Sequence, residues 1–281
     1  MQPIVKWVGG KRQLLNEIKK RLPKEFNVYF EPFIGGGALL FYFLPQCAHI
    51  NDYNEELINL YQVIKSSNDS IVKLIKFLNG YEMMHSEDFF YQIRELDRLG
   101  DYKNISSLLR ATRLIYLNKA GFNGLYRVNS KGHFNVPWGK KEKVKLYDLS
   151  NLENIHNYFI NNNISITNLD FEAATINAQE NDFVYFDPPY DPWENKNTFT
   201  TYTKDSFNRE EQIRLFKLFE NLTKRGVKCM LSNHNTEFIR NLYRDYQIDV
   251  VKARRQVNSK ASDRGPVEEV IITNYSDFRG E

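Results

Sequence analysis

Apolar and polar residues alternate along this chain in a pattern that predicts short buried strands separated by helices. The expected strands are apolar or alternating runs that stop at acids or turn residues, and they lie at 28–31, 49–52, 164–170, 183–187, 227–231, 248–252 and 267–274. Apolar residues three and four positions apart predict helices at about 12–22, 38–44 and 208–224. This succession predicts an α/β fold with a Rossmann-like, mostly parallel sheet and helices on both faces.

The middle of the chain follows a different pattern, because helices succeed one another there without strands between them. They are expected at 54–65, 70–79, 86–99, 105–118 and 149–161. Residues 121–141 contain the turn signals Asn-Gly, Ser-Lys-Gly and Pro-Trp-Gly around short alternating runs, which predicts a β-hairpin with loops. We therefore expect an α/β domain of residues 1–55 and 160–281 and a helical insert at 56–159, with the hairpin at about 121–141.

The strand at 183–187 ends in the sequence Asp187-Pro188-Pro189-Tyr190. Neither proline has an N–H group and each fixes φ near about −65°, so Asp187 begins a rigid turn at the carboxyl end of a strand. Open α/β sheets bind ligands at that end. The Asp187 carboxylate and the Pro188 carbonyl are two acceptors that suit an NH2 group on a flat ring, and Tyr190 offers a face for stacking. The alternative is a structural turn with a capping aspartate.

A second candidate site follows the strand at 28–31. Phe33 and the glycines from Gly35 to Gly37 precede an apolar helix, which is the layout of a nucleotide-binding βα unit. Their spacing matches neither the dinucleotide fingerprint nor the phosphate loop, which argues against an NTPase. Asp52 ends the next strand, where an acid hydrogen-bonds ribose hydroxyls; capping of the following helix is the alternative.

Two further stretches are candidates for ligand contacts. Two glycines precede the first helix, and Lys11 at that turn could hold a carboxylate or a phosphate, although a purely structural turn fits the sequence equally well. Asp170 and Phe171 follow the strand that begins at Ile164 and could face the adenine ring of a cofactor. A loop cap is the alternative for this second stretch.

Composition sets limits on the compartment and the partners. The 281 residues suffice for one large α/β domain with an insert, and a net charge of +3 permits a nucleic-acid partner without requiring one. We find no apolar run long enough to cross a membrane and no signal peptide. Cys47 and Cys229 lack metal-binding spacing, so we expect no metal site and two reduced thiols in a cytoplasmic protein.

Three stretches, residues 6–11, 31–37 and 187–190, together resemble the D12 class of adenine-N6 DNA methyltransferases, of the Dam and DpnII type (group alpha). The resemblance runs over nearly the whole chain. It implies S-adenosylmethionine as cofactor and methyl transfer to N6 of a flipped adenine in double-stranded DNA, within GATC. The α/β domain would then be catalytic, and the insert would recognise the target. Methylation of cytosine N4 or of another amino group, and a DNA-binding module without turnover, are the alternatives.

The same resemblance assigns roles to individual residues. The catalytic residues would be Asp187, Pro188, Pro189 and Tyr190. The cofactor would be bound by Trp7, Lys11, Phe33, Gly35, Gly37, Asp52, Asp170, Phe171 and Asp187.

Within the predicted hairpin, Phe-Asn-Gly-Leu-Tyr-Arg at 122–127 and Phe-Asn-Val-Pro at 134–137 resemble the segment that reads GATC in these enzymes. Basic side chains reach phosphates, an arginine clamps a guanine edge, and a bulky ring wedges into a base stack. The resemblance also allows for a cognate restriction endonuclease that acts on the same site, with no direct contact implied. The residues that touch DNA would be Lys6, Phe122, Asn123, Leu125, Arg127 and Pro137.

Overall fold

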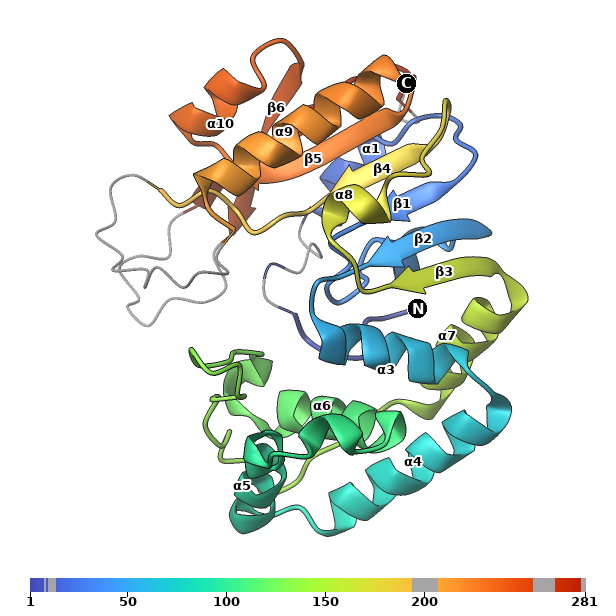
Figure 1. Cartoon of the computed structure of the whole chain (residues 1–281), viewed down its shortest axis with the longest axis vertical. Coiled ribbons are helices and arrows are strands. Elements are labelled where there is room, and N and C mark those ends of the chain that lie inside the picture. Colours follow the sequence, from blue (N-terminus) through green and yellow to red (C-terminus); the bar gives the residue numbers. More distant parts are fainter. Residues whose placement is uncertain (8, 10–13, 194–206, 255–265, 279–281) are drawn as a thin grey trace. The chain divides into compact units, whose positions relative to one another are not determined.

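The computed structural model describes residues 1–7, 9, 14–193, 207–254 and 266–278, and Figure 1 shows how their helices and strands are connected. The chain divides into two compact units. We call Met1–Gly10, Ile34–Gln46 and Asp52–Asn168 the helical unit, and Lys11–Phe33, Cys47–Asn51 and Leu169–Glu281 the sheet unit. Both units draw on the first 55 residues of the chain. The domain boundaries expected at 56 and 159 stay a prediction.

Seven strands in the described part of the chain form one sheet, in the order β3-β2-β1-β4-β5-β7-β6. Their bounds are β1 Tyr29–Glu31, β2 Cys47–Asn51, β3 Asn163–Thr167, β4 Phe183–Phe186, β5 Lys228–His234, β6 Gln247–Arg254 and β7 Pro266–Thr273. β1 pairs in parallel with β2 and β4, and β4 pairs in parallel with β5. β7 runs antiparallel to both β5 and β6. The predicted α/β fold with a mostly parallel sheet is confirmed.

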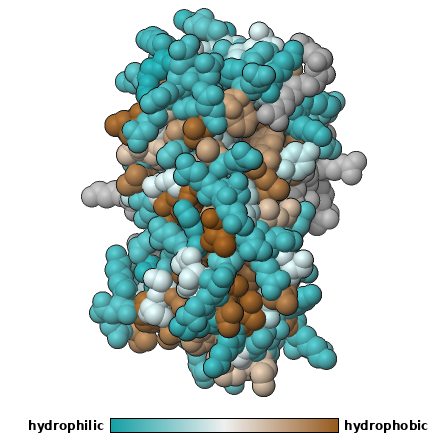
Figure 2. Space-filling model, turned by 90° about the vertical axis from the view of Figure 1, so that its right-hand side faces the viewer, coloured by the Kyte–Doolittle hydropathy of each residue, from teal (hydrophilic) through white to brown (hydrophobic). Residues whose placement is uncertain are grey.

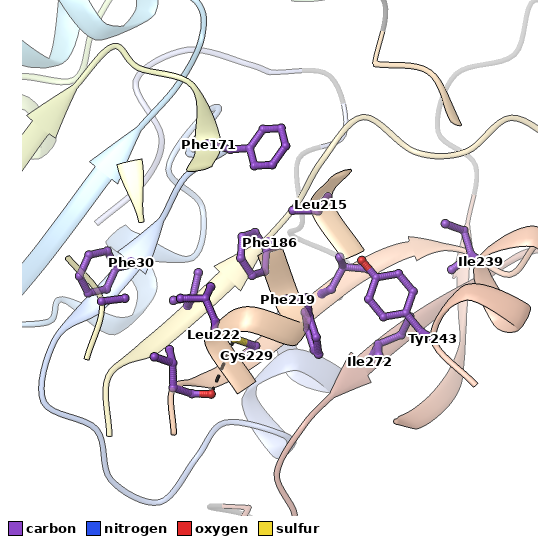
Figure 3. Packing of buried hydrophobic residues seen from close by; sticks show 14 of the residues in the cluster. Phe30, Phe171, Phe186, Leu215, Phe219, Leu222, Cys229, Ile239, Tyr243 and Ile272 are labelled. Atoms are coloured by element: carbon purple, nitrogen blue, oxygen red, sulfur yellow. Dashed lines mark hydrogen bonds between the residues drawn. The ribbon is translucent and has the colours of Figure 1, made fainter. Parts of the chain in front are cut away.

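The apolar core of the sheet unit fixes the position of β4. All four residues of β4, from Phe183 to Phe186, are buried, and a parallel strand lies on each side. Phe186 packs against Phe219, and Phe219 packs against Tyr243, within the cluster drawn in Figure 3. Burial of one such ring stabilises the fold by about 1.5–3 kcal/mol. A shift of β4 along the sheet would expose several of these rings, so their burial fixes the position at which the strand ends.

The helices described in the sheet unit are α1 Leu15–Lys20, α8 Phe171–Ala174, α9 Arg209–Lys224 and α10 Glu237–Leu242. Three of these four, α8, α9 and α10, begin after a side-chain cap, while α1 has none. The side chain of Asn208 accepts the backbone N–H groups of Glu210 and Glu211 at 2.9 and 3.1 Å, which satisfies two donors at the start of α9. The predicted helix at 208–224 is thereby confirmed.

Helices also dominate the helical unit, as the sequence predicts. They are α2 Leu40–Phe43, α3 Glu55–Lys65, α4 Asn68–Met83, α5 Glu87–Glu95, α6 Ser107–Ala120 and α7 Leu149–Asn161, with 3-10 turns at Leu96–Arg98, Tyr102–Asn104 and Phe122–Gly124. A serine caps each of α4, α5 and α6, at Ser67, Ser86 and Ser106. Ten of the fourteen residues of α6 are buried, which makes α6 the centre of this unit.

The predicted hairpin folds back on itself as an antiparallel arm, by which we mean residues 121–141. Isolated bridges join Gly121 to Trp138 and Val128 to Phe134 in place of a continuous ladder. A regular ladder is interrupted because Asn123 has a φ of 54° inside a 3-10 turn and Pro137 has no N–H to donate. The segment therefore keeps the course of a hairpin without forming strands.

Polar residues cover most of the face drawn in Figure 2, with smaller apolar patches between them. Among the residues that the structure describes, no helix combines the length and the apolar character needed to span a bilayer. Cys47 is half-buried and Cys229 is buried, and neither forms a disulfide.

Candidate active site

The first part of the site is the turn that follows β4 in the sheet unit. Asp182 fixes the start of the strand, because its carboxylate accepts the N–H groups of Val28 at 3.0 Å and Gln179 at 2.8 Å. The buried strand then delivers Asp187 to its carboxyl end, where the side chain is half-buried. Pro188 is buried. The structure thus places Asp187 at the edge where ligands of open α/β sheets bind.

Two contacts hold the side chain of Tyr190, one at its hydroxyl and one at its ring. Its hydroxyl donates to Glu269 Oε2 at 2.9 Å, and its ring lies edge-on to His234 with centroids 4.8 Å apart. Burial raises the pKa of the Tyr190 phenol well above its ordinary value, and the nearby Asp187 carboxylate adds to this effect. The phenol therefore stays neutral, and its ring keeps one orientation.

Phe33 and Phe171 come together in the sheet unit, although 137 residues separate them in the sequence. Their ring centroids lie 5.5 Å apart, and both rings contact Phe207, at 5.7 and 5.9 Å. The guanidinium of Arg214 lies 4.2 Å from the Phe171 centroid, within cation–π range. Phe207 and Arg214 were not among the predicted site residues.

Asp170 caps α8 by accepting the N–H of Glu172 at 3.0 Å, and it forms an ion pair with Arg214. The loop-cap alternative weighed from the sequence therefore describes this side chain correctly. The contacts of Asp170 and Phe171 with a cofactor stay a prediction.

Sequence reasoning missed Asn51, a buried amide at the end of β2. It donates to the carbonyls of Pro32 at 3.1 Å and Leu169 at 2.9 Å, and it accepts the N–H of Leu169 at 2.8 Å. Asn51 thereby joins the turn after β1 to the loop that precedes Asp170. The only available signal was an amide at the end of an otherwise apolar strand, which is common in turns.

The glycine turn, residues 35–37 of the helical unit, is built around Asp52. Its Oδ2 accepts the N–H of Gly35 at 2.9 Å, and its Oδ1 accepts the N–H of Asn54 at 2.9 Å. Burial raises the pKa of the Asp52 carboxyl, while these two hydrogen bonds act in the opposite direction. Asn54 caps α3 by accepting the N–H of Leu57 at 3.0 Å, so the alternative role of Asp52 as the helix cap is wrong.

Trp7 packs against the glycine turn. Gly35 has a φ of 49°, and a Cβ atom there would lie 2.9 Å from Trp7 Cδ1, so both conformation and space require glycine. The indole also stacks on Tyr126, with centroids 5.0 Å apart and planes at 23°. Gly37 has a φ of 71°. Lys11, the remaining predicted contact of this region, lies outside the described residues.

Lys6 lies against the arm. Asn118 of α6 accepts the N–H of Lys6 at 2.8 Å and donates to the Lys6 carbonyl at 2.8 Å. The same amide donates to the Gly124 carbonyl at 2.9 Å. A Cβ atom at Gly124 would meet Lys6 Cδ at 2.7 Å, so the lysine stem packs directly over this glycine. One buried amide thus brings Lys6 and the arm together.

The predicted DNA contacts share one property, which is access to solvent. Phe122 is 50% exposed although it is a large apolar ring, and Leu125 is half-buried. Arg127 is exposed, and its Nε donates to Asn135 Oδ1 at 2.7 Å, which limits the orientations of the guanidinium. The other exposed members of the set are Lys6, Asn123 and Pro137.

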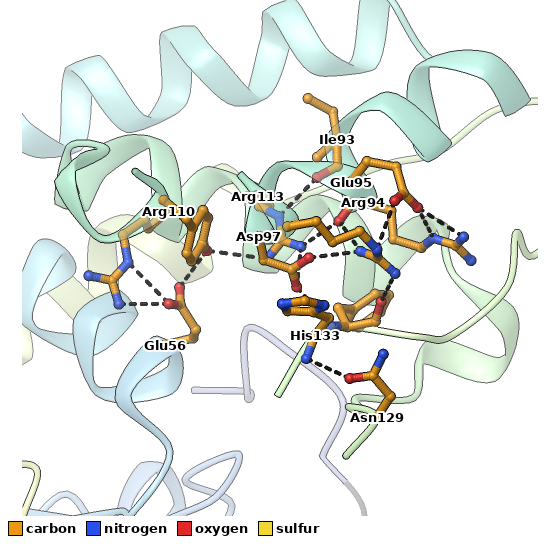
Figure 4. A network of polar contacts seen from close by, with 12 residues as sticks. Glu56, Ile93, Arg94, Glu95, Asp97, Arg110, Arg113, Asn129 and His133 are labelled. Carbon is orange, nitrogen blue, oxygen red and sulfur yellow. Dashed lines mark hydrogen bonds and ion pairs between the residues drawn. The ribbon is translucent and has the colours of Figure 1, made fainter. Parts of the chain in front are cut away.

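The carboxylate of Asp97, whose side chain is 9% exposed, anchors the arm at Phe134, close to the turn at 129–133 (Figure 4). Its Oδ2 accepts the backbone N–H of Phe134 at 2.7 Å and pairs with Arg113 at 2.8 Å. Its Oδ1 pairs with Arg98 at 2.8 Å, and Arg98 also donates to the Phe134 carbonyl at 3.0 Å. Both backbone groups of Phe134 are therefore fixed, and no motif in the sequence indicates this network.

Comparison with known proteins finds a matching family model and similar chains. The sequence model of a family described as D12 class N6 adenine-specific DNA methyltransferase matches residues 7–257. A Type II methyltransferase of Lactococcus lactis subsp. cremoris, M1.LlaDCHI, is 45% identical over 98% of this chain and 96% of its own length. The Type II methyltransferase M.MjaIII of Methanocaldococcus jannaschii is 40% identical over 98% of this chain and 99% of its own length. The DNA adenine methylase of Escherichia coli K12 is 34% identical over 95% of this chain and 93% of its own length.

Proposed function

Because the chain belongs to the D12 class of N6 adenine-specific DNA methyltransferases, we propose that its target is the adenine of GATC in duplex DNA. Members of this class transfer a methyl group from S-adenosylmethionine to DNA, and this is the activity of the chain. The target sequence and the roles of individual residues are the proposal.

The residues of the glycine turn fit the cofactor. S-adenosylmethionine supplies a methyl group activated on a sulfonium sulfur. Gly35 and Gly37 have φ values of 49° and 71°, which glycine adopts without strain, and the fixed Asp52 carboxylate suits ribose hydroxyls. We assign cofactor binding to these residues and to the others predicted from the sequence, which are Trp7, Lys11, Phe33, Asp170, Phe171 and Asp187.

The turn after β4 suits the exocyclic amine of adenine. The lone pair of N6 is delocalised into the ring, so the nitrogen is a poor nucleophile. Asp187 and the Pro188 carbonyl would accept its two N–H bonds and stabilise the positive charge that develops on nitrogen during attack. Because the turn is rigid, the two acceptors reorganise little as the reaction proceeds.

A base inside a duplex is out of reach, so the adenine must leave the helix before it reacts. Unstacking costs a few kcal/mol. Stacking on the ring of Tyr190, which is already held by Glu269, would return about 1–3 kcal/mol. The exposed ring of Phe122, with Asn123 beside it, would fill the space that the base leaves.

The observation that carries this proposal is the buried strand β4, which ends at Asp187 and two prolines. We expect Asp187→Ala to lower the rate of methyl transfer by about 100- to 1000-fold, the cost of losing one preorganised group. Binding of a GATC duplex, measured by fluorescence anisotropy, should change little. Transfer at near the wild-type rate would contradict the role of Asp187.

Target sequence is tested separately, with the wild-type protein and two duplexes. One contains GATC, and the other is identical except that the site is GAAC. We expect labelled methyl groups to enter the first duplex alone, and the product to become resistant to a nuclease that is blocked by GATC adenine methylation. Equal labelling of both would refute GATC as the target while leaving adenine methylation intact.

We further propose that the enzyme works in the cytoplasm beside a restriction endonuclease of the same specificity. Two of the similar proteins are named Type II methyltransferases, which supports this setting. Expression of the chain in a host that carries a GATC-cutting endonuclease should protect the host DNA. Cutting of DNA in those cells would argue against the pairing.

A further inference from the structure

The turn after β4 cannot be held by its own N–H groups at Pro188 and Pro189, because proline has none. Its fixation must come through carbonyl oxygens and through the residues that follow. The Pro189 carbonyl accepts from Gln212 Nε2 of α9 at 2.8 Å. Gln212 is 1% exposed, so this amide has exchanged its contacts with water for this bond.

A second buried amide continues the chain of hydrogen bonds. Asn233 of β5 donates to Gln212 Oε1 at 3.1 Å, and its own Oδ1 accepts the N–H of Asp191 at 2.9 Å. Asn233 is fully buried. The two amides therefore connect Pro189 and Asp191, the residues on either side of Tyr190, with α9 and β5.

Asp191 is fixed through its side chain as well. One carboxylate oxygen accepts the hydroxyl of Thr236 at 2.7 Å, and the other pairs with Arg209 at 3.1 Å. Its carbonyl accepts from His234 Nδ1 at 2.7 Å. The Asp191 side chain is fully shielded from solvent while the Arg209 side chain is 46% exposed. Thr236 is buried and also caps α10.

Stability alone is a weak reason for such an arrangement. A carboxylate and two amides buried in this way are costly to desolvate, and apolar residues of similar size are often as stable or more so. What the polar set provides is geometry, because each hydrogen bond fixes one position of the backbone around Tyr190. Tyr190 in turn is bound at its hydroxyl by Glu269.

We propose that Gln212, Asn233, Asp191 and Thr236 are positioning residues of the methyl transfer. They fix the backbone that carries Asp187 and Tyr190, so that both side chains hold one orientation before the adenine arrives. The inference rests on the proposed roles of Asp187 and Tyr190. Since these four residues act through the turn, their loss should reduce kcat and leave the KM values for DNA and cofactor within about twofold. A displacement of 1 Å at a reacting group costs up to about 100-fold in rate.

The first test uses isosteric substitutions at Thr236. Thr236→Val removes the hydroxyl from Asp191 at nearly constant volume, and we expect kcat to fall by about 10- to 100-fold. Thr236→Ser keeps the hydroxyl and should restore most of the rate. Thr112→Val is the matched control, because it deletes a buried hydroxyl whose bond, to Leu108 at 2.8 Å, stays within α6. Its kcat should equal that of the wild type.

Gln212→Glu supplies a second and independent readout, which decides the matter if Thr236→Val does not fold. The new carboxylate turns an oxygen toward the Pro189 carbonyl in place of the N–H, so kcat should fall at about pH 8.5. Protonation of this buried carboxyl restores a donor. The rate relative to wild type should therefore recover as the pH is lowered to about 6, which a purely structural role would not produce.

The outcomes separate this inference from the proposed function. Wild-type kcat in both Thr236→Val and Gln212→Glu would overturn the inference, as would a loss of kcat that Thr236→Ser does not restore and that shows no dependence on pH. If Asp187→Ala is inactive in the same assay, the role of Asp187 survives either result. If Asp187→Ala is active, the proposed role fails, whatever the other variants do.

Discussion

Replacement of Asp97 by asparagine tests whether one buried carboxylate holds the arm in place. The side chains of Asp97 and Arg113 are only 9% and 6% exposed, and they pair at 2.8 Å. In Asp97→Asn the guanidinium of Arg113 keeps its bonds to the carbonyls of Ile93 and Arg94 but loses its counter-ion. An uncompensated charge of this kind costs about 3–5 kcal/mol.

Asparagine retains one carbonyl oxygen of similar position, which can still accept the N–H of Phe134. We therefore expect a loss of about 2–4 kcal/mol in the free energy of unfolding, somewhat below the cost of an unpaired charge. Equilibrium unfolding in urea at pH 7.5 measures this loss. A fall of that size is a large part of the roughly 5–15 kcal/mol that stabilises a domain, yet most of the variant stays folded.

The matched control is Asp69→Asn in α4. Asp69 pairs with Lys73 at 2.5 Å, but the two side chains are 69% and 58% exposed, so this pair is worth about 0–1 kcal/mol. We also expect Asp97→Asn to raise the KM for the GATC duplex, because Phe134 and the arm lose an anchor. A loss of stability no greater than that of Asp69→Asn would refute the reasoning.

Three further variants test other parts of the protein. Gly35→Ala places a methyl group 2.9 Å from Trp7 at a φ of 49°, so calorimetric titration should show weaker S-adenosylhomocysteine binding by about 1–2 kcal/mol. Arg127→Ala should cost about 1–3 kcal/mol in binding of GATC and less with GAAC, as measured by anisotropy; an equal loss on both would contradict base readout. Burial lowers the pKa of His85, so the native fold favours the neutral ring, and stability present above about pH 6.5 should be lost as the pH falls below it. The Tm of His85→Gln, measured across this range, should fall less than that of the wild type.

Much of the fold could be predicted because local patterns and burial agree. The helix expected at 149–161 has the bounds of α7, and the apolar run at 183–187 gives β4 and the turn at Asp187. β5, in contrast, continues to His234, three residues beyond its predicted end. Ser232 and Asn233 look like turn residues in the sequence, but both are buried and hydrogen-bonded within the sheet unit. Tertiary contacts overrode their local preference.

Candidate site residues could be predicted where they form a contiguous motif, as in Asp187-Pro188-Pro189-Tyr190. The residues that hold this turn, such as Gln212 and Asn233, could not be predicted, because each acquires its role only through contact with a residue far away in the sequence. In the sequence, Gln212 is an ordinary polar residue near the start of an amphipathic helix, and Asn233 lies in what is predicted to be a loop. Only the pairing of β4 with β5 and the packing of α9 bring both amides to Pro189 and Asp191. Pro188 and Pro189 supply no N–H groups, so the turn depends on donors from other elements. The same two prolines that make the site recognisable in the sequence therefore explain why the residues that hold it come from elsewhere in the chain.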